Sequence, residues 1–200
     1  TLLYHAPLLS TPMDATLEFL QASMVGDTPS VALALQDPRS NPNAADVDGW
    51  TALIHSAIKG HTPVVDLLLK DSRVDPNKTD VVGVSAVLAA ALAGHSSVLR
   101  LLLDVDCVNC NVVTTSGHTA LMFAAQRGHT PVIRLLLSDG RADPTIERHT
   151  GDTAFLVAAI EGHNTAVEAF LEDERIDPNV ANGEGNTALM LAATKGHTSV

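Results

Sequence analysis

The apolar residues of this chain fall into short runs that recur with a constant period. Each period holds two such runs, for example "ALMFAA" from Ala120 and "VIRLLL" from Val132, separated by a polar turn. In the second run, apolar residues stand at i, i+3 and i+4, the spacing of one helical face. The first run is rich in alanine, and small side chains let neighbouring helices pack closely. The pattern therefore predicts pairs of short helices repeated along the chain.

The turn between the two runs carries the clearest marker of the repeat. A Gly-His pair recurs at 60–61, 94–95, 128–129, 162–163 and 196–197, which gives a period of 34. Glycine readily adopts the positive φ at which helices commonly end, so Gly128 is expected to terminate the first helix of its pair. Thr51 is a suitable N-cap for a first helix. Thr130-Pro131 favours the start of a second helix, because proline is tolerated at the first helical position.

One helix pair cannot bury its apolar face alone, whereas a row of stacked pairs can. We therefore predict a single domain over residues 1–200, with Leu135, Leu136 and Leu137 in the core. The units are expected at about 12–45 (degenerate), 46–79, 80–113, 114–147, 148–181 and 182–200 (incomplete). In the first unit, Leu17 replaces the threonine and Asp27 the histidine. In the last, Leu189 and Leu191 are expected to lack their usual cover, which suggests a fragment of a longer chain.

The repeated unit resembles the ankyrin repeat. Residues 117–145 read "GHTALMFAAQRGHTPVIRLLLSDGRADPT", and the lead-ins "NAADVDG" (43–49) and "NKTDVVG" (77–83) match the finger of that family. The resemblance covers residues 12–200. It implies an all-α solenoid of stacked helix-turn-helix units with β-hairpin-like finger loops.

The chain departs from the family pattern in three ways. Its period is slightly longer than the family period of about 33 residues. Alanine replaces the family proline at 52, 86, 120, 154 and 188, and an apolar residue replaces the family histidine two positions later, as at Ile54 and Met122. The usual Thr–His hydrogen bond should therefore be absent, and packing must take its place.

Composition restricts the classes of partner. The net charge is −11, and no basic stripe that could neutralise phosphates is present, so nucleic acid and anionic membranes are disfavoured. No uninterrupted apolar run of about 20 residues exists, so no membrane insertion is expected. Two cysteines are too few for a disulfide framework, which favours a reducing compartment and a cytoplasmic, or else nuclear, protein.

Candidate chemistry is sparse. The Gly-His histidines stand one unit apart, roughly 10 Å if helices pack normally, so neighbours cannot share a metal ion with bonds of about 2 Å. They are interpreted as turn residues. The sequence "CVNC" at Cys107–Cys110 is half a zinc site or a redox pair at most, and it falls in a turn where other units have Arg73 and Pro76. No G-x-S-x-G or H-E-x-x-H is present, so neither catalysis, cofactor nor metal is expected.

The ankyrin resemblance implies that a protein or peptide partner binds the concave face, formed by the finger tips and the first helices. Seventeen positions are expected to face it: Val47, Asp48, Trp50, Ile58, Lys59, Val81, Val82, Val84, Leu92, Thr115, Ser116, His118, Gln126, Arg127, His149, Asp152 and Ile160. The set is apolar in its N-terminal half, where Trp50 is a typical interface anchor. The alternative is that residues 1–9, themselves apolar, fold over this patch.

These observations favour a non-catalytic, monomeric protein-binding scaffold. The second hypothesis is a recognition arm of a larger enzyme or membrane-linked protein. The third, a metal or redox function for "CVNC", would require a stoichiometric metal. The sequence does not name the partner.

Overall fold

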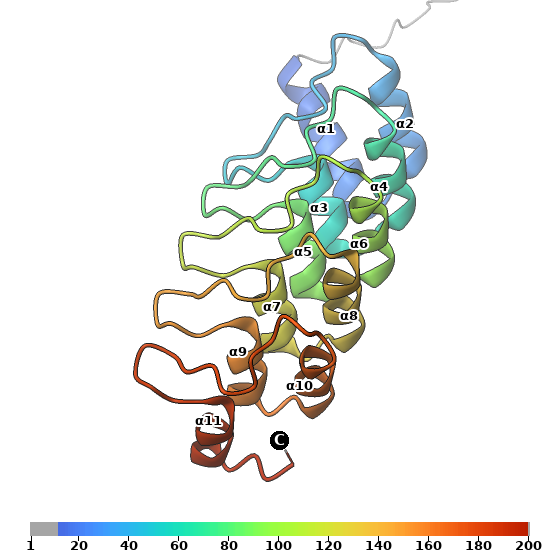
Figure 1. The fold of residues 1–200 in the computed structure, drawn as a ribbon. Helices are drawn as coiled ribbons and strands as arrows, with labels where there is room; N and C mark the ends of the chain where they lie inside the picture. Colours follow the sequence, from blue (N-terminus) through green and yellow to red (C-terminus); the bar gives the residue numbers. More distant parts are fainter. Residues whose placement is uncertain (1–11, 200) are drawn as a thin grey trace, which may run out of the picture.

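The computed structural model describes residues 12–199, which form an elongated stack of helices with loops projecting on one side (Figure 1). The helices are α1 (Pro12–Val25), α2 (Thr28–Gln36), α3 (Ala52–Lys59), α4 (Thr62–Leu69), α5 (Ala86–Ala93), α6 (Ser96–Leu103), α7 (Ala120–Arg127), α8 (Thr130–Asp139), α9 (Ala154–Glu161), α10 (Asn164–Leu171) and α11 (Ala188–Lys195). Within this part of the chain, β-structure is limited to two isolated β-bridges. The all-α solenoid is confirmed.

The helices form two layers. The odd-numbered helices pack in sequence order, α3 between α1 and α5 and so on to α11, and the even-numbered helices α2 to α10 form the second layer behind them (Figure 1). Within a unit the first helix packs against the second, as α7 does against α8. The loops before α3, α5, α7, α9 and α11 are the fingers, and they line up along one edge.

The local signals act as expected at the helix ends. The hydroxyls of Thr51, Thr119 and Thr153 accept bonds from the backbone N–H three residues on, at 3.3, 3.3 and 3.4 Å. Gly128 ends α7 in the left-handed region, with φ +68°. Because these signals recur along the chain, similar pairs of helices form repeatedly.

The core runs along the stack between the two layers. All of α5 from Ala86 to Ala91 is buried, because first helices have neighbours on both sides. Leu136 and Leu137 are buried, but Leu135 is only partly buried, which corrects the expectation of three core leucines. A helix turns by about 100° per residue, so three consecutive side chains cannot all face one side.

The two ends of the stack differ. At the C-terminal end, Leu189 is 75% exposed, whereas Leu121 at the same position of an inner unit is 2% exposed. Leu191 is partly buried against the core, so the expectation that it lacks cover is wrong; its helix, α11, packs against α9 of the preceding unit. At the N-terminal end, exposed Glu18 stands where inner units have a buried alanine such as Ala52.

Candidate partner-binding surface

Each finger is a tight hairpin-like turn held by two backbone hydrogen bonds, one that closes its base and one from the finger glycine N–H to the carbonyl three residues earlier. The N–H of Asp46 donates to the Trp50 carbonyl at 3.1 Å, and equivalent bonds close the later fingers, at 3.0 Å between Arg148 and Asp152. Gly49, with φ +86°, lets the finger approach the next one, where a Cβ would lie 3.0 Å from Asp80 Cα. Bonds between fingers, such as Val81 N–H to Asp48 O at 3.2 Å, join them into a row.

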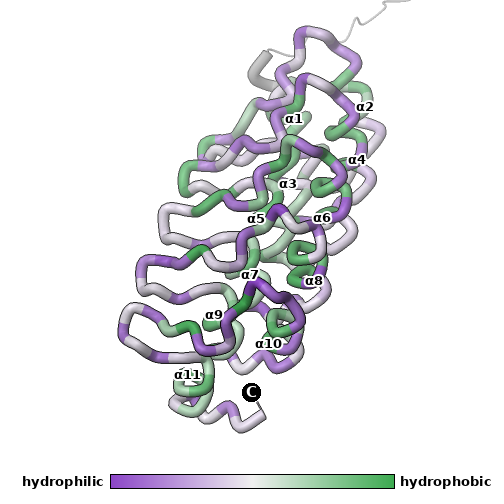
Figure 2. Tube along the Cα trace, viewed as in Figure 1, coloured by the Kyte–Doolittle hydropathy of each residue, from purple (hydrophilic) through white to green (hydrophobic). Residues whose placement is uncertain are grey.

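The tips of the first fingers expose valines. Val47 is 97% exposed, Val81 70%, Val82 46% and Val113 44%. We call Val47, Val81 and Val82, which lie in the turns of the first two fingers, the valine tips; Val113 lies just before the third finger. Figure 2 shows hydrophobic colour on the finger before α5 and hydrophilic colour on the finger before α9. The apolar character therefore belongs to the N-terminal half of the row.

The tips of the later fingers are polar. Thr115, Ser116 and His149 are exposed, and no valine stands among them. The side chain of His149 reaches back to the Thr115 carbonyl at 3.4 Å. The two halves of the row therefore offer chemically different surfaces.

Trp50 lies on a polar support at the base of the first finger. Its ring centroid is 5.2 Å from that of His55, a buried residue of α3. Asp46 Oδ2 contacts His55 Nε2 at 2.8 Å, while its Oδ1 accepts bonds from the N–H groups of Asp48 (3.1 Å) and Trp50 (2.9 Å). Burial raises the pKa of Asp46, but the bonds from Trp50 N–H and His55 hold it below its usual value. Asp46 thus fixes the finger while Trp50 stays partly exposed.

A second aromatic pair occupies the same two positions two units later. His118 stacks on Phe123, with ring centroids 5.2 Å apart and planes at 16°. Ser116 Oγ lies 3.0 Å from His118 Nδ1. Burial, followed by the positive charge of Arg148, lowers the pKa of His118. The neutral ring is therefore favoured on this surface.

Asp152 is the exception among the seventeen predicted residues, because it is buried, with 3% exposure. Its Oδ2 accepts from Arg148 Nη2 (2.6 Å) and from Thr150 Oγ1 (2.5 Å), and its Oδ1 from Asn182 Nδ2 of the next finger (2.8 Å). Burial raises the pKa of Asp152, but these bonds together lower it. This carboxylate ties two fingers together and is not a surface group.

The first helices lie behind the fingers and carry the rest of the predicted binding residues. Ile58, Leu92, Gln126 and Ile160 lie partly buried in one row, with exposed Lys59 and Arg127 beside it and Val84 at the base of the second finger. Met24 and Val25 extend the row into the first unit, at 41% and 66% exposure. They were not predicted, because the first unit was treated as degenerate, although they stand one period before Ile58 and Lys59.

Comparison with known proteins agrees with this architecture. A family model described as ankyrin repeats in three copies matches residues 19–107, 72–148 and 140–200. The chain belongs to the ankyrin-repeat family. The crystal structure of EF0377, an ankyrin repeat protein, superimposes with a TM-score of 0.83 at 28% identity, covering 92% of this chain and 94% of that one. No curated protein matches significantly.

The Gly-His histidines have a structural role in this ankyrin array. His95 Nε2 donates to the Ile58 carbonyl at 3.2 Å, and His129 donates likewise to Leu92 at 3.2 Å. A Cβ on Gly60 would lie 2.7 Å from the His95 ring, so glycine makes room for the histidine of the next unit. The interpretation as turn residues holds, with the added role of tying units together.

Other chemical groups are scattered. Among residues 12–199, no group of three His, Cys, Asp or Glu side chains is placed to hold a metal ion. Cys107 is exposed, Cys110 is buried, and both are free thiols. Burial raises the pKa of the Cys110 thiol. In the same part of the chain, every helix is too short or too polar to cross a bilayer.

Val113 and His55 were also not predicted from the sequence. Val113 lies one position before the finger residues that were considered, and its signal is a valine where other units have Ala45 or Glu147. His55 stands where other units have residues such as Ala89, and that departure from the repeat was its signal. Residues 1–9, proposed as an alternative cover for the patch, lie outside the described residues.

Proposed function

We propose that this chain is a non-catalytic scaffold that binds a protein or peptide on the N-terminal half of its concave face. Ankyrin repeats are generally protein–protein interaction modules, and this chain belongs to that family. The observation that carries the more specific proposal is the row of valine tips on neighbouring fingers. Contiguous exposed apolar surface commonly marks a binding site.

The valine tips have no role in closing their fingers. The side chains of Asp46 and Asp80 hold the finger backbones instead. Asp80 Oδ1 accepts the N–H groups of Val82 (2.9 Å) and Val84 (2.7 Å), as Asp46 does one unit earlier. A polar residue at Val47 or Val82 would leave these bonds intact. Exposed apolar residues that the fold does not require favour a function in recognition.

The shape of the surface favours an extended or helical segment. Val47 and Val81 stand one unit apart at the same position of successive fingers. Behind them, Trp50 lies at the base of the first finger, and Ile58 and Leu92 lie one unit apart on α3 and α5, all three partly buried. A segment lying along the array could place apolar side chains between these two sets of residues, as amphipathic helices do in hydrophobic grooves. Trp50, partly buried and held from behind by His55, is suited to be the central anchor.

The proposal is tested with a partner isolated by affinity capture and identified by mass spectrometry. Val47→Asp with Val82→Asp, and separately Trp50→Ala with Val82→Asp, should weaken its affinity about a hundredfold, because two desolvated anchors are lost. Thr115→Asp with His149→Asp is the matched control on the polar half and should have little effect. Unchanged affinity in both patch variants would refute the proposed surface.

The remaining properties are proposed from charge and cysteine chemistry. An acidic chain with two free cysteines suits a monomer in the cytoplasm or nucleus, with a protein rather than nucleic acid as partner. Light scattering at micromolar concentration tests the monomer, and a retarded DNA or RNA probe would contradict the partner class.

A further inference from the structure

At three joints, the turn after the second helix carries an ion pair that ties its unit to the one before it. Arg73 Nη2 contacts Asp71 Oδ2 at 2.6 Å. The same guanidinium donates to the carbonyls of Leu35 (2.7 Å) and Ser40 (3.3 Å) of the preceding unit. The last carbonyls of a helix lack partners within it, so Arg73 caps the end of α2 from the next unit. We call this Asp-x-Arg arrangement the arginine clamp.

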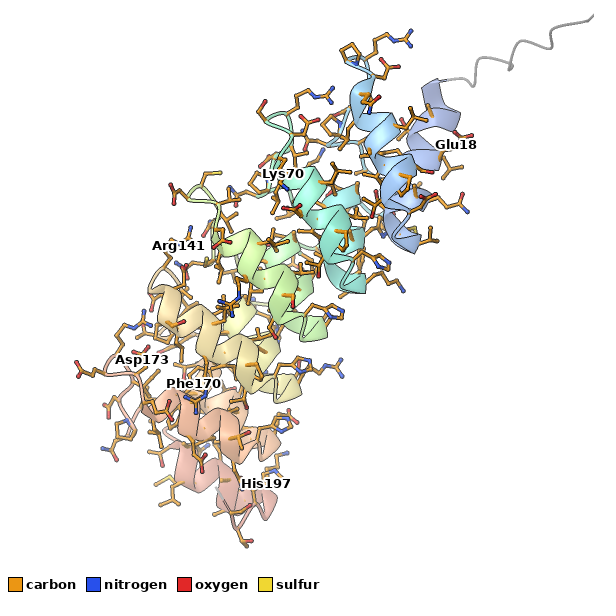
Figure 3. The ribbon with its side chains drawn as sticks, turned by 90° about the vertical axis from the view of Figure 1, so that its right-hand side faces the viewer. Glu18, Lys70, Arg141, Phe170, Asp173 and His197 are labelled. Atoms are coloured by element: carbon orange, nitrogen blue, oxygen red, sulfur yellow. The ribbon has the colours of Figure 1, made fainter. Side chains whose placement is uncertain are left out.

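The arginine clamp recurs at two later joints. Arg141, paired with Asp139, donates to the carbonyls of Leu103 and of Val105, the latter at 3.1 Å. Arg175, paired with Asp173, donates to Leu137 (3.2 Å) and Ala142 (2.8 Å). In Figure 3, Arg141 and Asp173 lie along the same edge of the array. The clamp is therefore a regular part of this array, at positions offset by whole periods of the repeat.

One joint within the described array lacks both members of the clamp. Between the units 46–79 and 80–113, Val105 stands in the aspartate position and Cys107 in the arginine position. Valine has no polar group, and a thiol is only a weak donor, so the end of α4 receives no guanidinium from the next unit. We call this contact the central joint.

The central joint and the next joint are otherwise matched. At the central joint, Asn77 donates to the Cys107 carbonyl and accepts from Asn109 N–H, both at 2.7 Å. At the next joint, Asn111 makes the same two bonds, to the Arg141 carbonyl (2.9 Å) and from Asp143 N–H (2.8 Å). The two joints thus share this side-chain ladder and differ in the clamp.

The contacts that the fingers and the first helices make across the two joints are also equivalent. Val81 N–H donates to Asp48 O at 3.2 Å across the central joint, and Thr115 N–H donates to Val82 O at 2.9 Å across the next. Each joint also has a histidine tie, the hydrogen bond from a Gly-His histidine to a carbonyl of the preceding unit: His95 to Ile58 at the central joint and His129 to Leu92 at the next. The first helices pack across both joints, α3 against α5 and α5 against α7. The absence of the clamp is therefore the main difference between the two joints.

We propose that the central joint is a hinge at which the array opens before it opens at the next joint. The stability of a repeat array is approximately a sum of units and nearest-neighbour contacts, so local opening concentrates at the weaker contact. The hinge lies between Val47 on one side and Val81 on the other. A partner that covers both residues would hold the hinge closed; this second statement rests on the proposed function, whereas the hinge itself does not.

Hydrogen exchange of single amides in the full chain tests the hinge without any partner. After correction for intrinsic rates, Asn109 and Val81 should exchange about tenfold faster than their counterparts Asp143 and Thr115, because charge-assisted bonds are missing at their joint. Equal protection of the two pairs of amides in the wild-type chain would overturn the proposal.

Two exchanged variants provide a reciprocal control. Val105→Asp with Cys107→Arg installs the clamp and should slow Asn109 and Val81 about tenfold, with Asp143 and Thr115 unchanged. Asp139→Val with Arg141→Cys should make the next joint resemble the central one, speeding exchange of Asp143 and Thr115. Failure of either shift would overturn the role of the clamp. Because no partner is present, neither outcome depends on the proposed binding surface, and the two proposals fail separately.

Discussion

The fingers at residues 46–50 and 148–152 have the same backbone turn but reverse the placement of their charges. In the first, the carboxylate is at the start, and Asp46 holds its own finger and His55. In the second, the start is Arg148, and the carboxylate of Asp152 is buried at the end and shared with Asn182. The same position of the repeat therefore holds a partly exposed tryptophan, Trp50, in one unit and the buried carboxylate of Asp152 in another. Position within a repeat does not by itself determine exposure.

The largest expected effect comes from removing the buried carboxylate. Asp152→Ala leaves Arg148, Thr150 and Asn182 without their shared acceptor, and it should lower the free energy of unfolding by about 2–4 kcal/mol. Asn186→Ala, at the same position of the last finger, should cost less than about 1 kcal/mol because Asn186 Nδ2 bonds only to the exposed Glu184. Urea unfolding measures both. An equal loss of unfolding free energy in Asp152→Ala and Asn186→Ala would contradict a special structural role for the buried carboxylate.

Acid should reduce the difference in the free energy of unfolding between the wild-type chain and Asp152→Ala. A carboxyl whose pKa is lower in the folded chain stabilises it above the unfolded pKa, near 4, and this contribution is lost as pH falls through the folded pKa. The pKa of Asp152 is lowered in the folded chain. The gap in unfolding free energy should therefore stay constant from about pH 7 to 5 and shrink by about half in stronger acid. A constant gap below pH 4 would contradict the ionised role.

A smaller difference is expected between two finger glycines. Gly151 has φ +78°, and a Cβ there would clash with the backbone nitrogen of Gly183, whereas Gly185, with φ +81°, has nothing within 4 Å. Gly151→Ala should cost about 2–3 kcal/mol and Gly185→Ala about 1 kcal/mol, the cost of the left-handed backbone alone. Equal losses in urea unfolding would show that the close approach is relieved without cost.

The smallest effect concerns the first finger. Asp46→Ala should cost about 1 kcal/mol, because His55 and two backbone N–H groups lose an acceptor that water partly replaces. Trp50 is the only tryptophan of the chain, so its emission reports on this finger and should shift to longer wavelength as the indole loses its support. Asp80→Ala, one unit later, is the control: similar cost with unchanged emission is expected.

The fold could be predicted from the sequence because its signals repeat. Thr51, Gly128 and the Thr130-Pro131 pair each act through local backbone chemistry, which needs no knowledge of distant residues. The wrong expectations concern the degree of side-chain burial. Leu135 packs against the core but is only partly buried, and Leu191 of the last unit still packs against the core.

The candidate surface was less predictable, because it depends on departures from the repeat. Asp152 was placed on the surface from its position, but the charge reversal with Arg148 draws it inside. His55 was missed because its partner, Asp46, is brought to it only by the turn of the finger. Partners that meet through folding leave no pattern in a single sequence.

The histidine ties join residues only 37 positions apart, for example His163 to Gln126 and His197 to Ile160. The ends of the array therefore communicate only through intermediate neighbours, and folding requires no search for distant segments. The loss of stability caused by a substitution in one unit should decrease over the next one or two units. Because the effects of a substitution stay local, the residues of each finger can change in evolution without destabilising the rest of the molecule.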